Sequence, residues 1–124
     1  MYALSIKQPW ASLILAGIKP VENRTWSTSY RGPLLMHASK TWDKRGAEFI
    51  IEKHPELKKF IESSKKTTGF LGQATMTDCV KEHHSEWFDG PYGFVFIKPM
   101  EFQNPIPYKG QLGIFYVPEK VMEE

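Results

Sequence analysis

The chain is divided into short segments of alternating character, and glycine or proline separates most of them. The clearest case is 20–26, where Glu22, Arg24 and Trp26 face one way and the intervening residues face the other. About six short strands with such punctuation favour a small closed or nearly closed β-barrel with a mixed strand arrangement. The segments expected to be strands are 2–6, 20–26, 33–39, 69–80, 92–98, 101–103 and 112–117.

Two helical regions interrupt these strands. Pro9 is expected to open a short apolar helix that Gly17 stops. Residues 43–63 are expected to be helical in two pieces, because His54 precedes Pro55 and a residue before proline avoids the helical conformation. We therefore predict an α+β fold with helices flanking the barrel. The apolar side chains expected to dock the second region are Phe49, Ile50, Leu57, Phe60 and Ile61.

Length and charge limit the class of protein. The 124 residues are expected to form a single domain, 1–124, and the formal net charge is only +2. This mild basicity permits nucleic-acid binding but does not argue for it. The single cysteine, Cys79, excludes an internal disulfide and a cysteine-based zinc cluster, and it fits a reducing compartment.

The first residues include no basic stretch that leads into an apolar run, so we expect no signal peptide. The longest apolar run, 11–16, is far shorter than the ~20 residues that a membrane-spanning helix needs. The expected location is cytoplasmic.

The segment 17–26 gathers most of the chemistry. Lys19 precedes the second expected strand, and Glu22 and Arg24 share one face of that strand. A helix end, an amine, a carboxylate and a guanidinium are therefore expected to converge there. The following turn and strand add Tyr30, Arg31, His37, Ser39 and Lys40.

This arrangement resembles the ASCH domain, a family of the PUA-like superfamily of small β-barrels. The resemblance covers nearly the whole chain and implies a PUA-like mixed β-barrel whose cleft the motif lines. The residues that carry it are Leu4-Ser5-Ile6-Lys7-Gln8-Pro9-Trp10, Gly17-x-Lys19-x-x-Glu22-x-Arg24, Trp26, Tyr30-Arg31-Gly32, His37-Ala38-Ser39 and Gly110-Gln111-Leu112-Gly113.

The family resemblance implies more than one function. ASCH domains resemble RNA-binding PUA modules, some occur in transcription coactivators, and other small members are amidohydrolases of acylated cytidine nucleosides or ribonucleases. In the amidohydrolases, a lysine and a threonine lie three residues apart and a glutamate follows on a later strand. Lys19 matches the lysine, but Glu22 stands at the threonine position. The strand expected at 69–80 contains no glutamate, and Asp78 is its nearest carboxylate.

Each candidate residue has two interpretations. Lys19 is either a nucleophile or base with a lowered pKa, or a salt-bridged or anion-binding lysine. Glu22 is either a general base or the partner of a neighbouring cation. Arg24 and Arg31 either bind phosphate or carboxylate, or bridge backbone carbonyls at the rim of the barrel.

The aromatic residues and histidines divide in the same way. Trp26 and Tyr30 could stack on a base, whereas Trp10 is expected in the core. His83 and His84 lie near Glu86 and Asp89, but adjacent histidines point to different sides, so a solvated loop is favoured over a metal site.

The favoured function is recognition of RNA, a nucleotide or a modified nucleoside. The alternative is an amidohydrolase-like or ribonuclease-like hydrolase that uses Lys19 with Glu22, and a protein-interaction domain is a third class. The partner is RNA or a nucleotide-derived small molecule, not a membrane, and no metal or cofactor is expected. The ligand-binding residues are expected to be Lys7, Arg24, Trp26, Tyr30, Arg31, His37 and Ser39.

Overall fold

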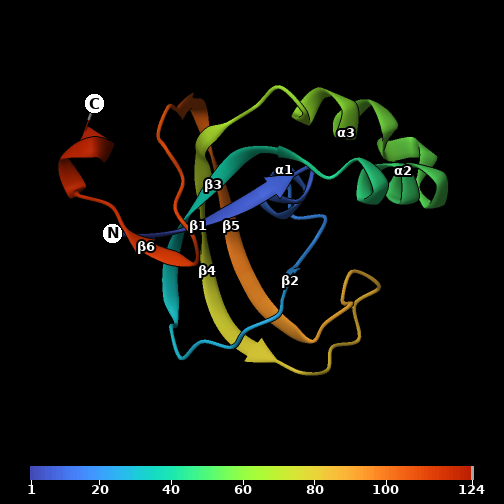
Figure 1. Cartoon of the computed structure of the whole chain (residues 1–124), viewed down its shortest axis with the longest axis horizontal. Coiled ribbons are helices and arrows are strands. Elements are labelled where there is room, and N and C mark those ends of the chain that lie inside the picture. Colours follow the sequence, from blue (N-terminus) through green and yellow to red (C-terminus); the bar gives the residue numbers. More distant parts are fainter. Residues whose placement is uncertain (124) are drawn as a thin grey trace.

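The strands of the chain form one mixed six-stranded sheet (Figure 1). The computed structural model describes residues 1–123. The sheet order is β2-β5-β4-β3-β1-β6, in which β1 and β3 run parallel and the other neighbours are antiparallel. The strands are β1 (Tyr2–Gln8), β2 (Val21–Arg24), β3 (Gly32–Trp42), β4 (Gly69–Val80), β5 (Tyr92–Ile106) and β6 (Ile114–Tyr116).

The α+β class predicted from the sequence is confirmed, but the expectation of a barrel is wrong as far as closure is concerned. β2 and β6 form the two edges of the sheet and do not pair with each other. β2 has four residues and pairs with β5, while β6 has three and pairs with the first half of β1. The two edge strands are too short to close the sheet, so the second half of β1 forms no backbone ladder with β2. Alternation in the sequence identifies the strands but does not predict whether their edges meet.

The two helical regions expected from the sequence are present, and a short 3-10 turn near the C-terminus was not expected. The helical elements are α1 (Trp10–Leu15), α2 (Lys44–Lys53), the 3-10 turn η1 (Pro55–Leu57), α3 (Lys58–Ser64) and the 3-10 turn η2 (Glu119–Glu123). Gly17 follows α1 with φ of +77°, a left-handed conformation that favours glycine. The break at His54–Pro55 is confirmed, since α2 ends at Lys53.

α2 and α3 lie at one end of the sheet, and β6 lies at the other with both termini (Figure 1). The N-terminal ammonium donates to the Val117 carbonyl at 3.0 Å, which holds the two ends together. Two expected strands, 92–98 and 101–103, are one strand, β5, that continues through Lys98 at φ of +52°. In the described residues no helix is long and apolar enough to cross a membrane.

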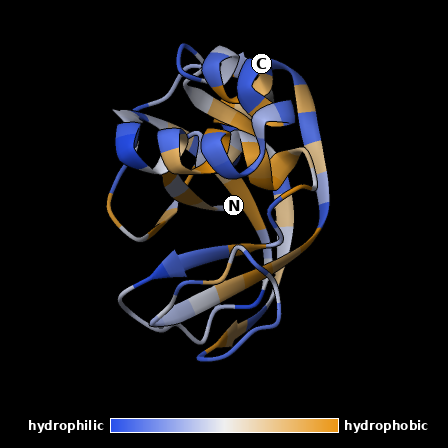
Figure 2. Ribbon diagram, turned by 90° about the vertical axis from the view of Figure 1, so that its right-hand side faces the viewer, coloured by the Kyte–Doolittle hydropathy of each residue, from blue (hydrophilic) through white to orange (hydrophobic). Residues whose placement is uncertain are grey.

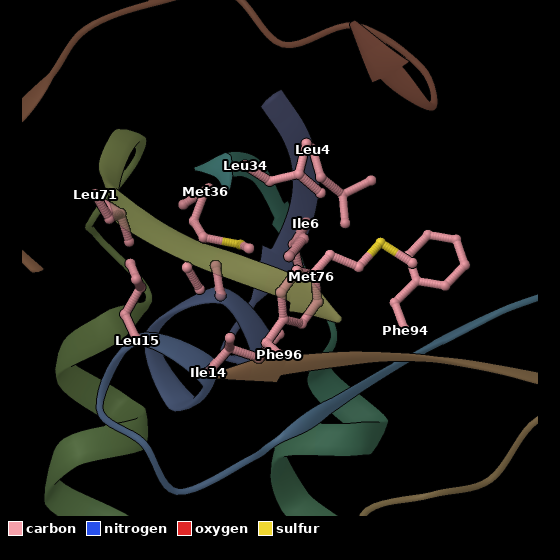
Figure 3. Packing of buried hydrophobic residues seen from close by; sticks show 13 residues of the cluster. Leu4, Ile6, Ile14, Leu15, Leu34, Met36, Leu71, Met76, Phe94 and Phe96 are labelled. Atoms are coloured by element: carbon pink, nitrogen blue, oxygen red, sulfur yellow. The ribbon is translucent and has the colours of Figure 1, made fainter. Parts of the chain in front are cut away.

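The main core fills the space between α1 and the inner face of the sheet. Side chains from β1, β3, β4, β5 and α1 point toward one another there (Figure 3). Its members are Leu4, Ile6, Ala11, Ile14, Leu15, Leu34, Met36, Ala38, Leu71, Ala74, Met76, Phe94 and Phe96.

Two smaller clusters complete the packing. One, built on Leu35, Phe70 and Phe115, lies on the outer face of the sheet. The other packs α1 against α2 and α3, whose hydrophilic and hydrophobic residues alternate along the ribbon (Figure 2). Ile50 and Ile61 are buried in it as expected, but Phe49 is 63% exposed and does not dock α2.

Two leucine substitutions test this description of the core. Leu4 is fully buried, and Leu112 is 99% exposed. Leu4→Ala should lower the free energy of unfolding by about 2–5 kcal/mol, because it removes buried methyl groups and leaves a cavity. The same change at Leu112 should alter it by less than about 0.5 kcal/mol. Urea unfolding of both variants measures the difference, and equal effects would contradict the packing.

Candidate functional site

Three charged side chains form a buried ionic chain around Glu22. The two oxygens of its carboxylate contact different cations: Oε1 lies 3.1 Å from Lys19 Nζ, and Oε2 lies 3.0 Å from Arg24 Nη2. The Lys19 and Glu22 side chains are only 4% and 8% exposed. Lys19 reaches Glu22 from the turn after α1, and Arg24 does so because it lies two residues further along β2.

Lys19 has further partners at this position. Its ammonium also donates to the Val21 carbonyl and lies 5.6 Å from the centroid of the Trp10 ring. Burial lowers the pKa of Lys19 from its ordinary value and Arg24 lowers it further, whereas Glu22 acts in the opposite direction.

Arg24 connects two strands that do not pair. Its Nη2 donates to the Ser5 carbonyl on β1 at 2.8 Å and also to Glu22. β2 and β1 share no backbone ladder, so this side-chain bond joins them across the open side of the sheet. Arg24 Nε is buried and has no hydrogen-bond partner among the described residues.

A cleft of about 1240 Å³ opens beside this ionic chain. Its walls come from β1, β2, the end of β3, the start of α1, the region of α2, and the loops at 86–90 and 111–113. Of the nine predicted catalytic or ligand-binding residues, six line the cleft: Lys7, Lys19, Glu22, Arg24, Trp26 and Ser39. The other lining residues with aromatic or charged side chains are Trp10, Asp43, Arg45, Phe49, Lys53, Glu86, Trp87, Phe88 and Asp89.

Asn23 attaches the 86–90 loop to β2. Its Nδ2 donates to the Trp87 carbonyl at 3.0 Å, and its Oδ1 accepts from the N–H groups of Asp89 and Gly90 at 2.8 and 3.1 Å. The Trp87 ring stacks on His54 at 5.7 Å, and His54 Nε2 lies 2.5 Å from Glu86 Oε1. One wall of the cleft is thus fixed to β2 and to the end of α2.

Tyr30 and Arg31 lie outside the cleft lining. The Tyr30 hydroxyl donates to the Pro33 carbonyl, its ring lies 5.7 Å from that of Tyr2, and burial raises its pKa. Arg31 donates to the carbonyls of Thr28 and Tyr30 and lies 3.6 Å from Asp78. Both side chains therefore brace the 28–33 turn.

His37 is also outside the lining, because its ring is buried on the outer face of the sheet. It is 3% exposed, and its ring packs edge-on against Phe70 and Phe115. Both ring nitrogens have partners, Ser5 Oγ and the Tyr108 carbonyl.

Several lining residues were not found from the sequence. Arg45, Phe49 and Lys53 come from the α2 region, and Trp87 comes from a loop more than 60 positions after β2. Trp10, expected in the core, is half-buried and donates to Asp43 Oδ2 at 3.0 Å. The one sequence feature that could have indicated any of these lining residues is the Trp87–Phe88 pair, because two adjacent aromatic residues are unusual within so polar a segment. Among residues 1–123, no group of three side chains has a metal-binding arrangement.

Comparison with known proteins gives the class of domain. The family model for the ASCH domain matches residues 4–120, so the chain belongs to the ASCH domain family.

Two relatives are similar over almost the whole chain. Human Activating signal cointegrator 1 is 30% identical over 134 aligned positions, and the mouse protein of the same name is 28% identical. Each alignment covers 97% of this chain but only 23% of the relative. The chain therefore spans about a quarter of the length of the curated relatives it matches.

Replacing Lys19 tests the effect of its burial. Its pKa is lower in the folded protein than the ordinary 10.5, so between these two values the unfolded chain binds more protons. The free energy of unfolding of the wild type should therefore rise with pH in that window. Lys19→Met should lack this rise, because methionine has no group that titrates. Urea unfolding at a series of alkaline pH values measures the slope.

The exposed Lys58 supplies the matched control. Lys58→Met should leave the pH dependence of the wild type unchanged. If Lys19→Met also leaves it unchanged, burial does not lower the pKa of Lys19.

Proposed function

We propose that the cleft binds single-stranded RNA or a nucleotide-derived small molecule. The observation that carries this proposal is that flat aromatic side chains and unpaired cations line the same cleft. Membership of the ASCH family supports it, since the family resembles RNA-binding PUA modules.

The aromatic side chains suit base stacking. Trp26 is half-buried and packs edge-on against Phe94, with ring centroids 5.0 Å apart. Trp87 is fixed by its stack on His54. Unpaired bases stack on aromatic faces, and such a contact is worth about 1–3 kcal/mol per base. Rings already held in place lose little freedom when a base binds.

The cations that remain for phosphate are Lys7 and Arg45. Both are exposed, and neither forms an ion pair with another described residue. Lys19 and Arg24, in contrast, are occupied by Glu22. We therefore assign phosphate contacts to Lys7 and Arg45 and a supporting role to the ionic chain.

Salt dependence measures these contacts. Each phosphate contact to a single strand contributes about −0.7 to the slope of log affinity against log salt, so two contacts lower affinity roughly sevenfold between 50 and 200 mM. The double substitution Lys7→Ala/Arg45→Ala should remove most of this slope. Fluorescence anisotropy with a short labelled RNA gives the affinities.

Lys58→Ala/Lys59→Ala is the matched control, because it removes the same charge from exposed positions of α3. It should leave the slope unchanged. A nucleoside has no phosphate, so its binding should be nearly independent of salt. RNA that does not bind at low salt, while a nucleoside does, would overturn the RNA proposal.

Hydrolysis is a second candidate, favoured by one observation. Lys19, whose pKa is lowered by burial, lies beside the carboxylate of Glu22 on the cleft wall. An amidohydrolase-like or ribonuclease-like reaction would use this pair. The Lys19 ammonium, however, already donates hydrogen bonds to the Val21 carbonyl and to Glu22. These bonds stabilise the charged form of the lysine, and they therefore favour the binding function.

Lys19→Arg separates the two candidates. Arginine keeps the positive charge but does not deprotonate. A binding protein should therefore keep RNA or nucleoside affinity within a few-fold. An enzyme that uses neutral lysine should lose turnover of an N-acylated cytidine or a short RNA, measured by chromatography of the products. No product from the wild type would eliminate the hydrolase.

A further inference from the structure

Ser5 and His37 form a hydrogen-bonded pair that the proposed function does not use. They are paired residues of the parallel strands β1 and β3, and Ser5 Oγ lies 3.0 Å from His37 Nδ1. On the other side of the ring, His37 Nε2 lies 2.6 Å from the Tyr108 carbonyl oxygen. The three groups form a continuous chain from the 108 loop to the cleft.

The partners of the ring determine where its proton lies. A carbonyl oxygen only accepts hydrogen bonds, so Nε2 must carry the proton when the imidazole is neutral. Nδ1 then has a free lone pair, and the Ser5 hydroxyl donates to it. In this arrangement, a histidine can remove the proton of a serine as the serine attacks.

The serine is accessible from the cleft, whereas the histidine is not. Ser5 is half-buried and lines the cleft, and His37 is 3% exposed. A Cβ at Gly110 would lie 2.7 Å from both Ser5 Oγ and His37 Cε1. Any other side chain at 110 would therefore clash with the hydroxyl and the imidazole, so only glycine lets this backbone lie directly against the pair.

The loop that carries Gly110 also borders the cleft. Gln111 lines the cleft with Leu112, one and two residues after Gly110.

We propose that Ser5 is a nucleophile, activated by His37, that hydrolyses a carboxylic ester with a flat aromatic alcohol part. Ser5 Oγ forms a bond to the ester carbonyl carbon and passes its proton to His37 Nδ1. The bond to the alcohol oxygen then breaks, and His37 returns the proton to that oxygen. Water next attacks the acyl group on Ser5, with His37 again taking and returning one proton. The products are a carboxylic acid and an alcohol. The aromatic cleft lining suits the alcohol part.

A covalent probe tests the nucleophile without any RNA. In the first reaction, the protein is incubated with an alkyl fluorophosphonate, and intact mass and peptide mapping locate the adduct. In the second, the release of 4-nitrophenol from 4-nitrophenyl acetate gives the rate of ester hydrolysis. We expect one adduct, on Ser5, and none in Ser5→Ala. His37→Asn should slow both reactions about 10²–10⁴-fold, the usual contribution of a general base.

Ser63→Ala is the matched control, because the exposed Ser63 hydroxyl donates to the Phe60 carbonyl instead of an imidazole. It should label like the wild type. An unlabelled wild type, an adduct on another residue, or equal rates in Ser5→Ala would overturn the proposal. Urea unfolding checks that Ser5→Ala is folded, and that variant alone decides the result if His37→Asn does not fold. Failure of RNA binding leaves this test unaffected.

Discussion

The buried carboxylate of Glu22 is the interaction on which the arrangement of the cleft depends. Moving charged groups out of water is costly, and it is tolerated here because each carboxylate oxygen contacts one cation. Arg24 then extends this chain to the Ser5 carbonyl on β1. The ionic chain therefore holds β2 near β1 on the side where the sheet has no backbone ladder.

This link places the two chemical features of the cleft next to each other. Arg24 contacts the backbone of Ser5, and the side chain of Ser5 contacts His37. Ser5 is therefore the residue at which the two features meet. Its carbonyl accepts a hydrogen bond from the ionic chain, and its hydroxyl contacts His37. Base stacking and phosphate binding would take place further out, on Trp26, Lys7 and Arg45, where the side chains are less buried.

The sequence was informative wherever the determining contact is local. Alternation on β2 puts Glu22 and Arg24 on one face, and the break at His54–Pro55 follows from proline alone. Closure of the sheet depends on how far two short edges extend, which no local pattern encodes. Arg45 and Trp87 reach the cleft through tertiary packing, so they were missed. His37 and Tyr30 belong to the family motif, but neither of them lines the cleft.

The three hydrogen bonds of Asn23 reach only backbone atoms of the 86–90 loop. The loop is thus attached by its main-chain path, and the identities of its side chains play no part in that attachment. Substitutions at 86–89 would therefore leave the attachment to β2 in place, whereas those at Glu86 and Trp87 would remove the second attachment, to His54. The surface that this loop presents to the cleft can thus change through its side chains while the backbone contact with β2 stays the same.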